Sequence, residues 1–111
     1  MAAGSYNFTL EQGSTFSRRL TVQENNSALN LTGYSGRMQM RSTHDSDTII
    51  LSFTVTVSNA SAGQLTTTAS ATTTASITPG IYVYDLEIES SAGTVTRLMQ
   101  GNITVTPEVT R

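Results

Sequence analysis

Three groups of side chains in this sequence could do chemistry, and the first is the segment His44-Asp45-Ser46-Asp47. It places the chain's one histidine beside two carboxylates and a hydroxyl, the residue types of a catalytic triad. A triad needs these groups to converge from separate elements, whereas here they follow one another. The two aspartates are spaced as in a calcium loop, but its glycine and terminal glutamate are missing. We therefore predict a solvated turn between two strands, and no metal site.

The second and third groups are charged residues of opposite sign on two separate segments. Glu87 and Glu89 follow Asp85 at alternate positions, and paired carboxylates are the catalytic groups of glycosidases. Alternate residues of one strand point to the same side, however, and imply no cleft. Arg37 and Arg41 likewise share a parity. If the two strands are neighbours, cross-strand pairs between arginine and glutamate explain both groups, and we expect no catalytic residues.

The elements that position these groups are predicted to be strands. Apolar and polar residues alternate along most of the chain, as in an antiparallel sheet that is packed on one side. The alternating runs are Tyr6–Leu10, Phe16–Val22, Met38–Met40, Ile49–Val57, Tyr82–Ile88 and Val95–Val105. Glycine, asparagine, aspartate and serine separate them, as turns require. About seven short strands predict an all-β fold, an immunoglobulin-like antiparallel β-sandwich, as a single domain over residues 1–111.

Three local features depart from simple alternation. Residues 69–76 have no core face and predict either a loose connection or a short helical turn. Gly101 lies inside the long last run, where we expect a bulge or a bend. The Pro79-Gly80 turn leads two tyrosines into a strand, and one of their hydroxyls is expected to bond back to the turn as a tyrosine corner.

Composition excludes several classes of function. The 111 residues include 20 Thr and 14 Ser but six Arg, no Lys and no Cys, with a net charge of −2. Without cysteine there is no disulfide framework and no zinc ribbon, and without lysine no Schiff-base chemistry. We expect no cofactor, no nucleic-acid partner, which needs a basic face, and no membrane span, which needs about 20 apolar residues. The first residues lack the features of a signal peptide.

Motifs spread over most of the chain are similar to those of a known family. They are Glu11-Gln-Gly13, Asn30-Leu-Thr-Gly-Tyr34, Arg37-Met-Gln-Met-Arg41 and Pro79-Gly-Ile-Tyr-Val-Tyr-Asp-Leu-Glu87. They resemble the small immunoglobulin-like virion proteins of tailed phages, in particular the N-terminal domain of phage upper baseplate proteins. The resemblance implies a non-enzymatic virion structural protein, an adaptor in the tail, baseplate or fibre-attachment region. It also implies other virion proteins as partners, symmetric copies, and assembly in the host cytoplasm.

Two alternative functions stay open. Small β-sandwiches also serve as head decoration or cement proteins on the capsid. A carbohydrate-binding adsorption module would need exposed aromatic residues on one flat face, for which Tyr6 and Tyr34 are the candidates. Because charged pairs can select a partner subunit, we expect the interface to involve the charged strands and the two termini. The candidate interface residues are Arg37, Arg41, Glu87, Glu89 and Arg97.

Overall fold

The computed structural model describes residues 4–24 and 26–110, and strands dominate them. The strands are β1 (Gly4–Ser5), β2 (Phe8–Glu11), β3 (Phe16–Thr21), β4 (Gln23–Glu24), β5 (Ser27–Ala28), β6 (Ser35–Arg41), β7 (Leu51–Asn59), β8 (Gln64–Ala69), β9 (Gly80–Glu89) and β10 (Val95–Thr106). One five-residue helix, α1 (Ala71–Ala75), joins β8 to β9. The predicted all-β class is confirmed. No helix within the described ranges is long and apolar enough to cross a membrane.

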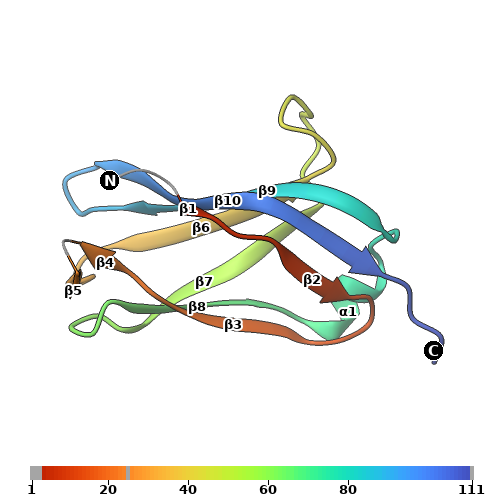
Figure 1. Cartoon of the computed structure of the whole chain (residues 1–111), viewed down its shortest axis with the longest axis horizontal. Helices are drawn as coiled ribbons and strands as arrows, with labels where there is room; N and C mark the ends of the chain where they lie inside the picture. Colours follow the sequence, from red (N-terminus) through yellow and green to blue (C-terminus); the bar gives the residue numbers. More distant parts are fainter. Residues whose placement is uncertain (1–3, 25, 111) are drawn as a thin grey trace.

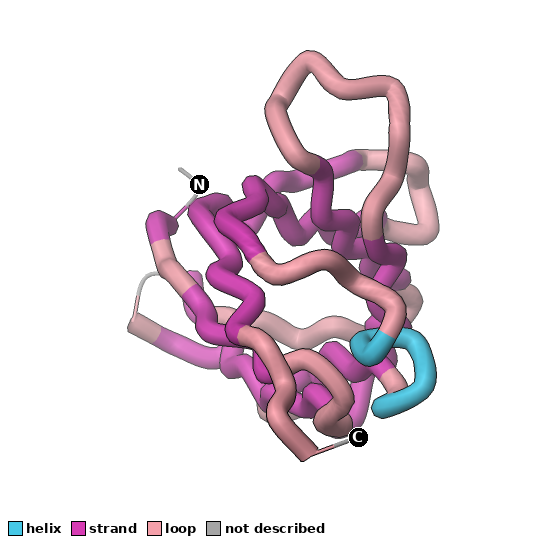
Figure 2. The backbone as a smooth tube through the Cα atoms, turned by 90° about the vertical axis from the view of Figure 1, so that its right-hand side faces the viewer, coloured by secondary structure: helices cyan, strands magenta, loops and turns pink. Residues whose placement is uncertain are grey.

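Eight of the strands form one sheet that curls over on itself (Figures 1 and 2). Their order is β1-β10-β9-β6-β7-β8-β3, and β2 also pairs with β10. In Figure 1, β6, β9 and β10 lie in an upper layer, while β3 and β8 lie in a lower one. Strands β4 and β5 form a separate two-stranded ribbon. The curl brings the apolar sides of the two layers face to face, which encloses the core.

Strand β7 belongs to both layers. Its first residues pair with β6, where Leu51 lies opposite Met40, and its later residues pair with β8. The strand therefore leaves the upper layer and enters the lower one. At the point of departure, a Cβ atom on Gly36 of β6 would lie 2.5 Å from Cγ1 of Val55. A glycine at this position gives the Val55 side chain room between the diverging strands.

The N-terminal strands correct the prediction of a wholly antiparallel sheet. Both β1 and β2 run parallel to β10, with Gly4 opposite Met99 and Phe8 opposite Ile103. The sheet is therefore mixed. The reason for the error is that side chains alternate with period two in parallel and antiparallel strands alike, so the pattern of β2 does not encode its direction.

Gly101 serves the attachment of these N-terminal strands and is not a bulge. It lies opposite Tyr84 in the regular register of β9 and β10. A Cβ atom on Gly101 would lie 2.2 Å from the carbonyl oxygen of Tyr6, so only glycine lets the Tyr6 backbone approach this closely. The hydroxyl of Tyr84 donates to the same carbonyl at 2.7 Å. The Asn102 N–H donates to Oδ1 of Asn7 at 3.0 Å.

The bulge in β10 lies between Arg97 and Met99 instead. Arg97 is opposite Glu87, but Met99 is opposite Leu86, so Leu98 is the additional residue, and it is buried. Arg97 and Met99 share a sequence parity, and a regular strand would turn a guanidinium toward the core at high cost. The bulge changes the phase of the strand, so that Arg97 points outward.

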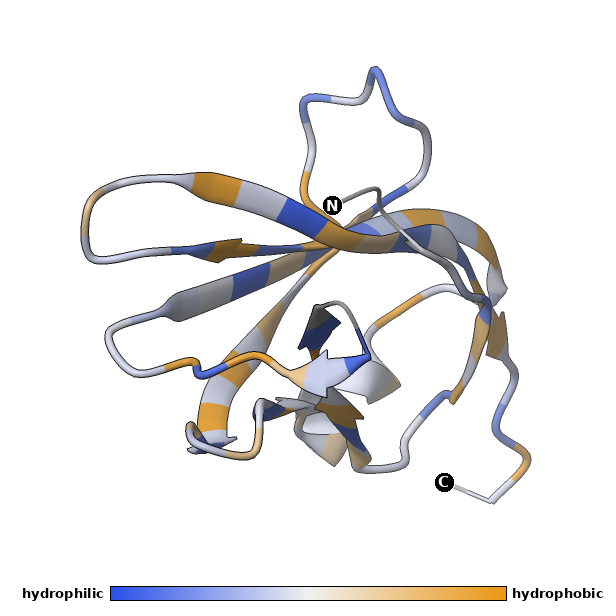
Figure 3. Cartoon of the chain, turned by 60° about the vertical axis from the view of Figure 1, so that its left-hand side comes forward, coloured by the Kyte–Doolittle hydropathy of each residue, from blue (hydrophilic) through white to orange (hydrophobic). Residues whose placement is uncertain are grey.

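The core is apolar and continuous between the layers, as the alternating hydropathy along the strands indicates (Figure 3). Its largest fully buried apolar side chains are Leu10, Leu31, Met38, Met40, Leu65, Leu86 and Ile103. The aromatic ring of Phe8 packs edge-on against Phe16, with centroids 5.8 Å apart. Two apolar residues expected on core faces are exposed at run ends: Ile49 by 44% and Val95 by 46%.

The connection between β8 and β9 contains a short helix, which was one of the two alternatives for residues 69–76. Ser70 caps α1, since its side chain accepts a hydrogen bond from the Thr73 N–H. Thr74 is fully buried, and its hydroxyl donates to the carbonyl of Ser14 at 2.8 Å. The hydroxyl of Tyr82 donates to the carbonyl of Thr78. The bond predicted from a tyrosine back to the Pro79-Gly80 turn is therefore confirmed.

Candidate interaction surface on strands β6, β9 and β10

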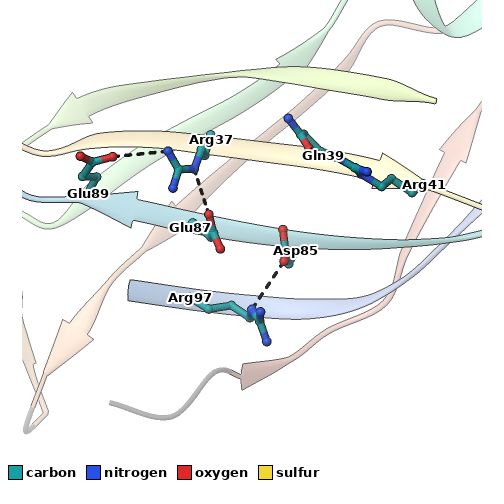
Figure 4. Close-up of polar contacts among 7 residues, drawn as sticks. All are labelled: Arg37, Gln39, Arg41, Asp85, Glu87, Glu89 and Arg97. Carbon is teal, nitrogen blue, oxygen red and sulfur yellow. Dashed lines mark hydrogen bonds and ion pairs between the residues drawn. The ribbon is translucent and has the colours of Figure 1, made fainter. Parts of the chain in front are cut away.

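The outer face of the upper layer carries charged and amide side chains in rows that the strand register sets. Glu87 on the middle strand β9 lies opposite both Arg37 of β6 and Arg97 of β10. Asp85, in the next row, lies opposite Gln39 and Gln100 on the same two strands. The outward carboxylates thus stand on β9, and hydrogen-bond donors flank them on both sides (Figure 4).

Arg37 binds two of the carboxylates. Its Nε lies 2.9 Å from Oε1 of Glu87, and its Nη1 lies 3.3 Å from Oε1 of Glu89. The hydrogen bond to Glu87 and the charge of that carboxylate raise the pKa of Arg37 above its usual value. The predicted cross-strand pairing is confirmed for these three residues. Because the arginine side chain is 56% exposed, water and salt screen these pairs, and they contribute little to stability.

Arg97 holds the third carboxylate of β9. Its Nε lies 3.5 Å from Oδ2 of Asp85, and its Nη1 donates to Oε1 of Gln100 at 3.4 Å. Arg97 was among the candidate interface residues, but its partner was not predicted. The sequence did indicate that Asp85 points outward, because Asp85 shares the parity of Glu87. It did not reveal the bulge that turns Arg97 outward beside it.

Arg41 differs from the other two arginines, because it lies opposite Val83 and forms no ion pair with any residue that the structure describes. Its Nη1 donates to the carbonyl of Ser46 at 2.6 Å, and its Nη2 donates to Oε1 of Gln39 at 3.0 Å. The expectation that Arg41 also pairs with glutamate is therefore wrong. Its role in the fold is to hold the β6–β7 loop, residues 42–50.

The β6–β7 loop contains the first candidate group of the sequence. His44, Asp45 and Asp47 are exposed there, so the prediction of a solvated turn between two strands is confirmed. Within residues 4–24 and 26–110, no three His, Cys, Asp or Glu side chains gather as metal ligands would. A shallow depression of about 300 Å³ lies between this loop and the outer face. Its walls carry both signs of charge, from Arg41, Asp85, Glu87 and Arg97.

The outer face of the lower layer is built from hydroxyls. Thr54 lies opposite Thr68, and Thr56 lies opposite Thr66, in the pairing of β7 with β8. The hydroxyl residues at outward positions of β3, β7 and β8 are Ser17, Thr21, Ser52, Thr54, Thr56, Ser58, Thr66 and Thr68. Among the described residues, Arg19 is the one charged side chain at an outward position of these strands; Arg18, which is also exposed on β3, shares the parity of Phe16, and its Cζ lies 4.9 Å from the centroid of that ring. The abundance of Ser and Thr thus gives one face that is nearly free of charge.

The aromatic side chains do not gather on a flat face. Phe8, Phe16, Phe53, Tyr82 and Tyr84 are buried. Tyr34 is half-buried against the core, and Tyr6 is 57% exposed with its ring 4.8 Å from that of Phe8.

Comparison with known proteins adds no relative. No family model matches the chain, and no curated protein matches it either. The similarity to phage virion proteins therefore rests on the motifs quoted above.

Proposed function

We propose that this chain is a non-enzymatic virion structural protein of a tailed phage, an adaptor that joins subunits in the tail, baseplate or fibre-attachment region. The observation that carries the proposal is the outer face of β6, β9 and β10. Three arginines and three carboxylates stand there on adjacent strands, and two of the arginines, Arg37 and Arg97, pair with all three carboxylates. A surface with both charges in a fixed register favours specific contact with a partner that matches it, and disfavours other partners.

An immunoglobulin-like sandwich is part of this proposal. The first strands run beside the last one, β3 pairs with β8, and β6 pairs with β9. Strand β7 leaves β6 for β8, and Tyr82 bonds back to Thr78 at the entry to β9. A tyrosine in this position is typical of Greek-key sandwiches. Sandwich domains of this kind present whole sheet faces to their partners, which suits an adaptor.

The placement in a virion is supported by the motif similarity and is tested in purified particles. Mass spectrometry of particles from a phage or prophage that encodes the chain is expected to detect it in a fixed ratio to tail proteins. Arg97→Glu, which reverses one charge of the face, is expected to lower its incorporation. Arg19→Glu on the opposite face is the matched control. Absence of the wild-type chain from particles contradicts the proposal.

A reconstruction of the particle by electron cryo-microscopy distinguishes the remaining placements. Density at the tail or baseplate supports the adaptor. Density on the capsid lattice would replace it with a head decoration or cement protein, for which the nearly uncharged face of β3, β7 and β8 offers a lattice contact.

A further inference from the structure

Strands β6 and β9 form a pair of complementary columns on the outer face. The outward residues Ser35, Arg37 and Gln39 of β6 are all hydrogen-bond donors. Directly opposite them on β9 stand the carboxylates of Glu89, Glu87 and Asp85, in that order. A column of donors therefore lies beside a column of acceptors, row by row, at the strand spacing of about 4.8 Å.

We propose that this face binds a second copy of the same chain, face to face. The inference deepens the proposed function, on which its setting in a particle rests. The two-fold axis runs parallel to the strands, between β6 and β9. Rotation about it places β9 over the partner's β6 without changing the rows. Glu87 then lies over the partner's Arg37, and Asp85 lies over the partner's Gln39.

This arrangement leaves no like charges in direct opposition between the two columns. Arg37, Glu87 and their two symmetry mates form a square of alternating charge. Arg37 uses Nε and Nη1 in the pairs of its own chain, and its Nη2 donates no hydrogen bond to a described carboxylate of that chain. A two-fold axis placed along β9 itself would instead stack carboxylate on carboxylate. The register of the strands thus selects one docking axis.

The size of the contact area sets the expected affinity of the dimer. With this axis β10 lies over the partner's β7, so the matched contact is the two columns of β6 and β9, which are paired over seven residues. They span about 10 by 24 Å, or roughly 240 Å², under a third of what each partner contributes to a standard interface. The pair is therefore expected to be weak in dilute solution and to weaken further with salt. In a symmetric particle, many linked copies raise the effective concentration and make such a weak contact sufficient.

The test is analytical ultracentrifugation of the purified chain and of charge-reversal variants. The wild-type chain is expected to dimerise reversibly at low salt. Arg37→Glu and Glu87→Arg each place like charges across the axis, and each is expected to weaken dimerisation about tenfold or more. An equimolar mixture of these two variants restores opposite charges across the axis, and so does the double variant. Both are expected to dimerise again.

Controls keep these outcomes interpretable. Arg19→Glu on the opposite face is expected to dimerise like the wild type, and circular dichroism confirms that each variant is folded. A wild-type chain that stays monomeric at about 1 mM and low salt overturns the inference, because weak interfaces assemble at that concentration. A mixture of folded variants that fails to dimerise also overturns it.

The same measurements separate this inference from the proposed function. If the chain is a monomer in solution but is present in particles, and Arg37→Glu is lost from them, the face binds another virion protein. The proposed function then stands and the self-association does not. If the chain dimerises as expected but is absent from particles, the reverse holds.

Discussion

The two outer faces of the molecule expose a sheet to water in opposite ways. The face of β6, β9 and β10 carries six charged groups, and five of them form ion pairs between neighbouring strands: Arg37 with Glu87 and Glu89, and Arg97 with Asp85. At outward positions of β3, β7 and β8, the described chain has mostly hydroxyls, the amide of Gln64 and a single charge, Arg19. A hydroxyl donates and accepts, and water satisfies it in any orientation, whereas an ion pair depends on geometry. The charged face can therefore select a partner, whereas the hydroxyl face places few geometric requirements on whatever contacts it.

On their core sides the two layers bury leucines equally well. The predictions with the largest expected effects test whether the two layers also contribute equally to stability. Leu86 lies under the charged face and Leu65 under the hydroxyl face, and both are fully buried. Leu86→Ala and Leu65→Ala are each expected to lower the free energy of unfolding by about 3 kcal/mol, because each leaves a cavity in the core. Urea denaturation measures both. A difference of more than about 2 kcal/mol between them would show that one layer dominates stability.

The effect of intermediate size is a loss of stability at alkaline pH, and it comes from Tyr84 on β9, beneath the charged face. Burial, with a contribution from Tyr6, raises the pKa of Tyr84 to about 12. The unfolded chain releases this proton near pH 10, so between these values it binds fewer protons than the folded chain. Stability is therefore fully present below pH 10 and is expected to fall by about 2 kcal/mol as the pH rises toward 12.

Tyr84→Phe checks the origin of this alkaline loss. The variant lacks the ionisable group, so its free energy of unfolding is expected to decline less steeply across the same pH range. Tyr34→Phe, at a half-buried position outside the β9 strand, is the matched control and should decline as the wild type does. Equal slopes for wild type and Tyr84→Phe would contradict the assignment.

The smallest effects separate the outer faces themselves. Glu87→Gln removes one charge from beside Arg37 and is expected to cost about 0–1 kcal/mol at low salt and almost nothing at high salt. Thr66→Val, on the opposite face, removes a hydroxyl that donates to Ser58 at 3.2 Å, and its cost is expected within about 0.5 kcal/mol at any salt concentration. Urea denaturation at two salt concentrations compares the two variants. A cost of Thr66→Val that changes with salt would contradict the expected difference between the faces.

Local pattern was enough to predict one strand and its charges. The alternation from Tyr82 to Ile88 placed the core side of β9 correctly, and with it the outward side of Glu87 and Glu89. Because β6 does lie beside β9, the pairing of Arg37 with both glutamates was predictable. The bond from Tyr82 back to the turn was also predictable, and a helical turn was one of two alternatives for residues 69–76, since each depends on residues close in sequence.

Contacts between distant segments were not predictable in this way. Nothing local in Phe8–Glu11 reveals that β2 runs parallel to β10, because strand direction is set by the path of the whole chain. A bulge or a bend was expected at Gly101, whereas the observed bulge lies between Arg97 and Met99, where it turns Arg97 outward. Gly101 instead leaves room for the backbone of Tyr6, which is 95 residues earlier in the sequence. Arg41 donates to the carbonyl of Ser46, whereas a carboxylate partner was expected.

The parallel course of the first and last strands gives the molecule a mechanical property. The N-terminal side of β1 and the C-terminal end of β10 lie toward opposite ends of the long axis (Figure 1), and β2 runs alongside β10 between them. A force that pulls the two ends apart slides β2 against β10 along their length. The bridging hydrogen bonds are then loaded together in shear and must fail together, whereas a hairpin pulled at its open end would unzip one bond at a time. The fold is thus oriented to bear tension between its termini.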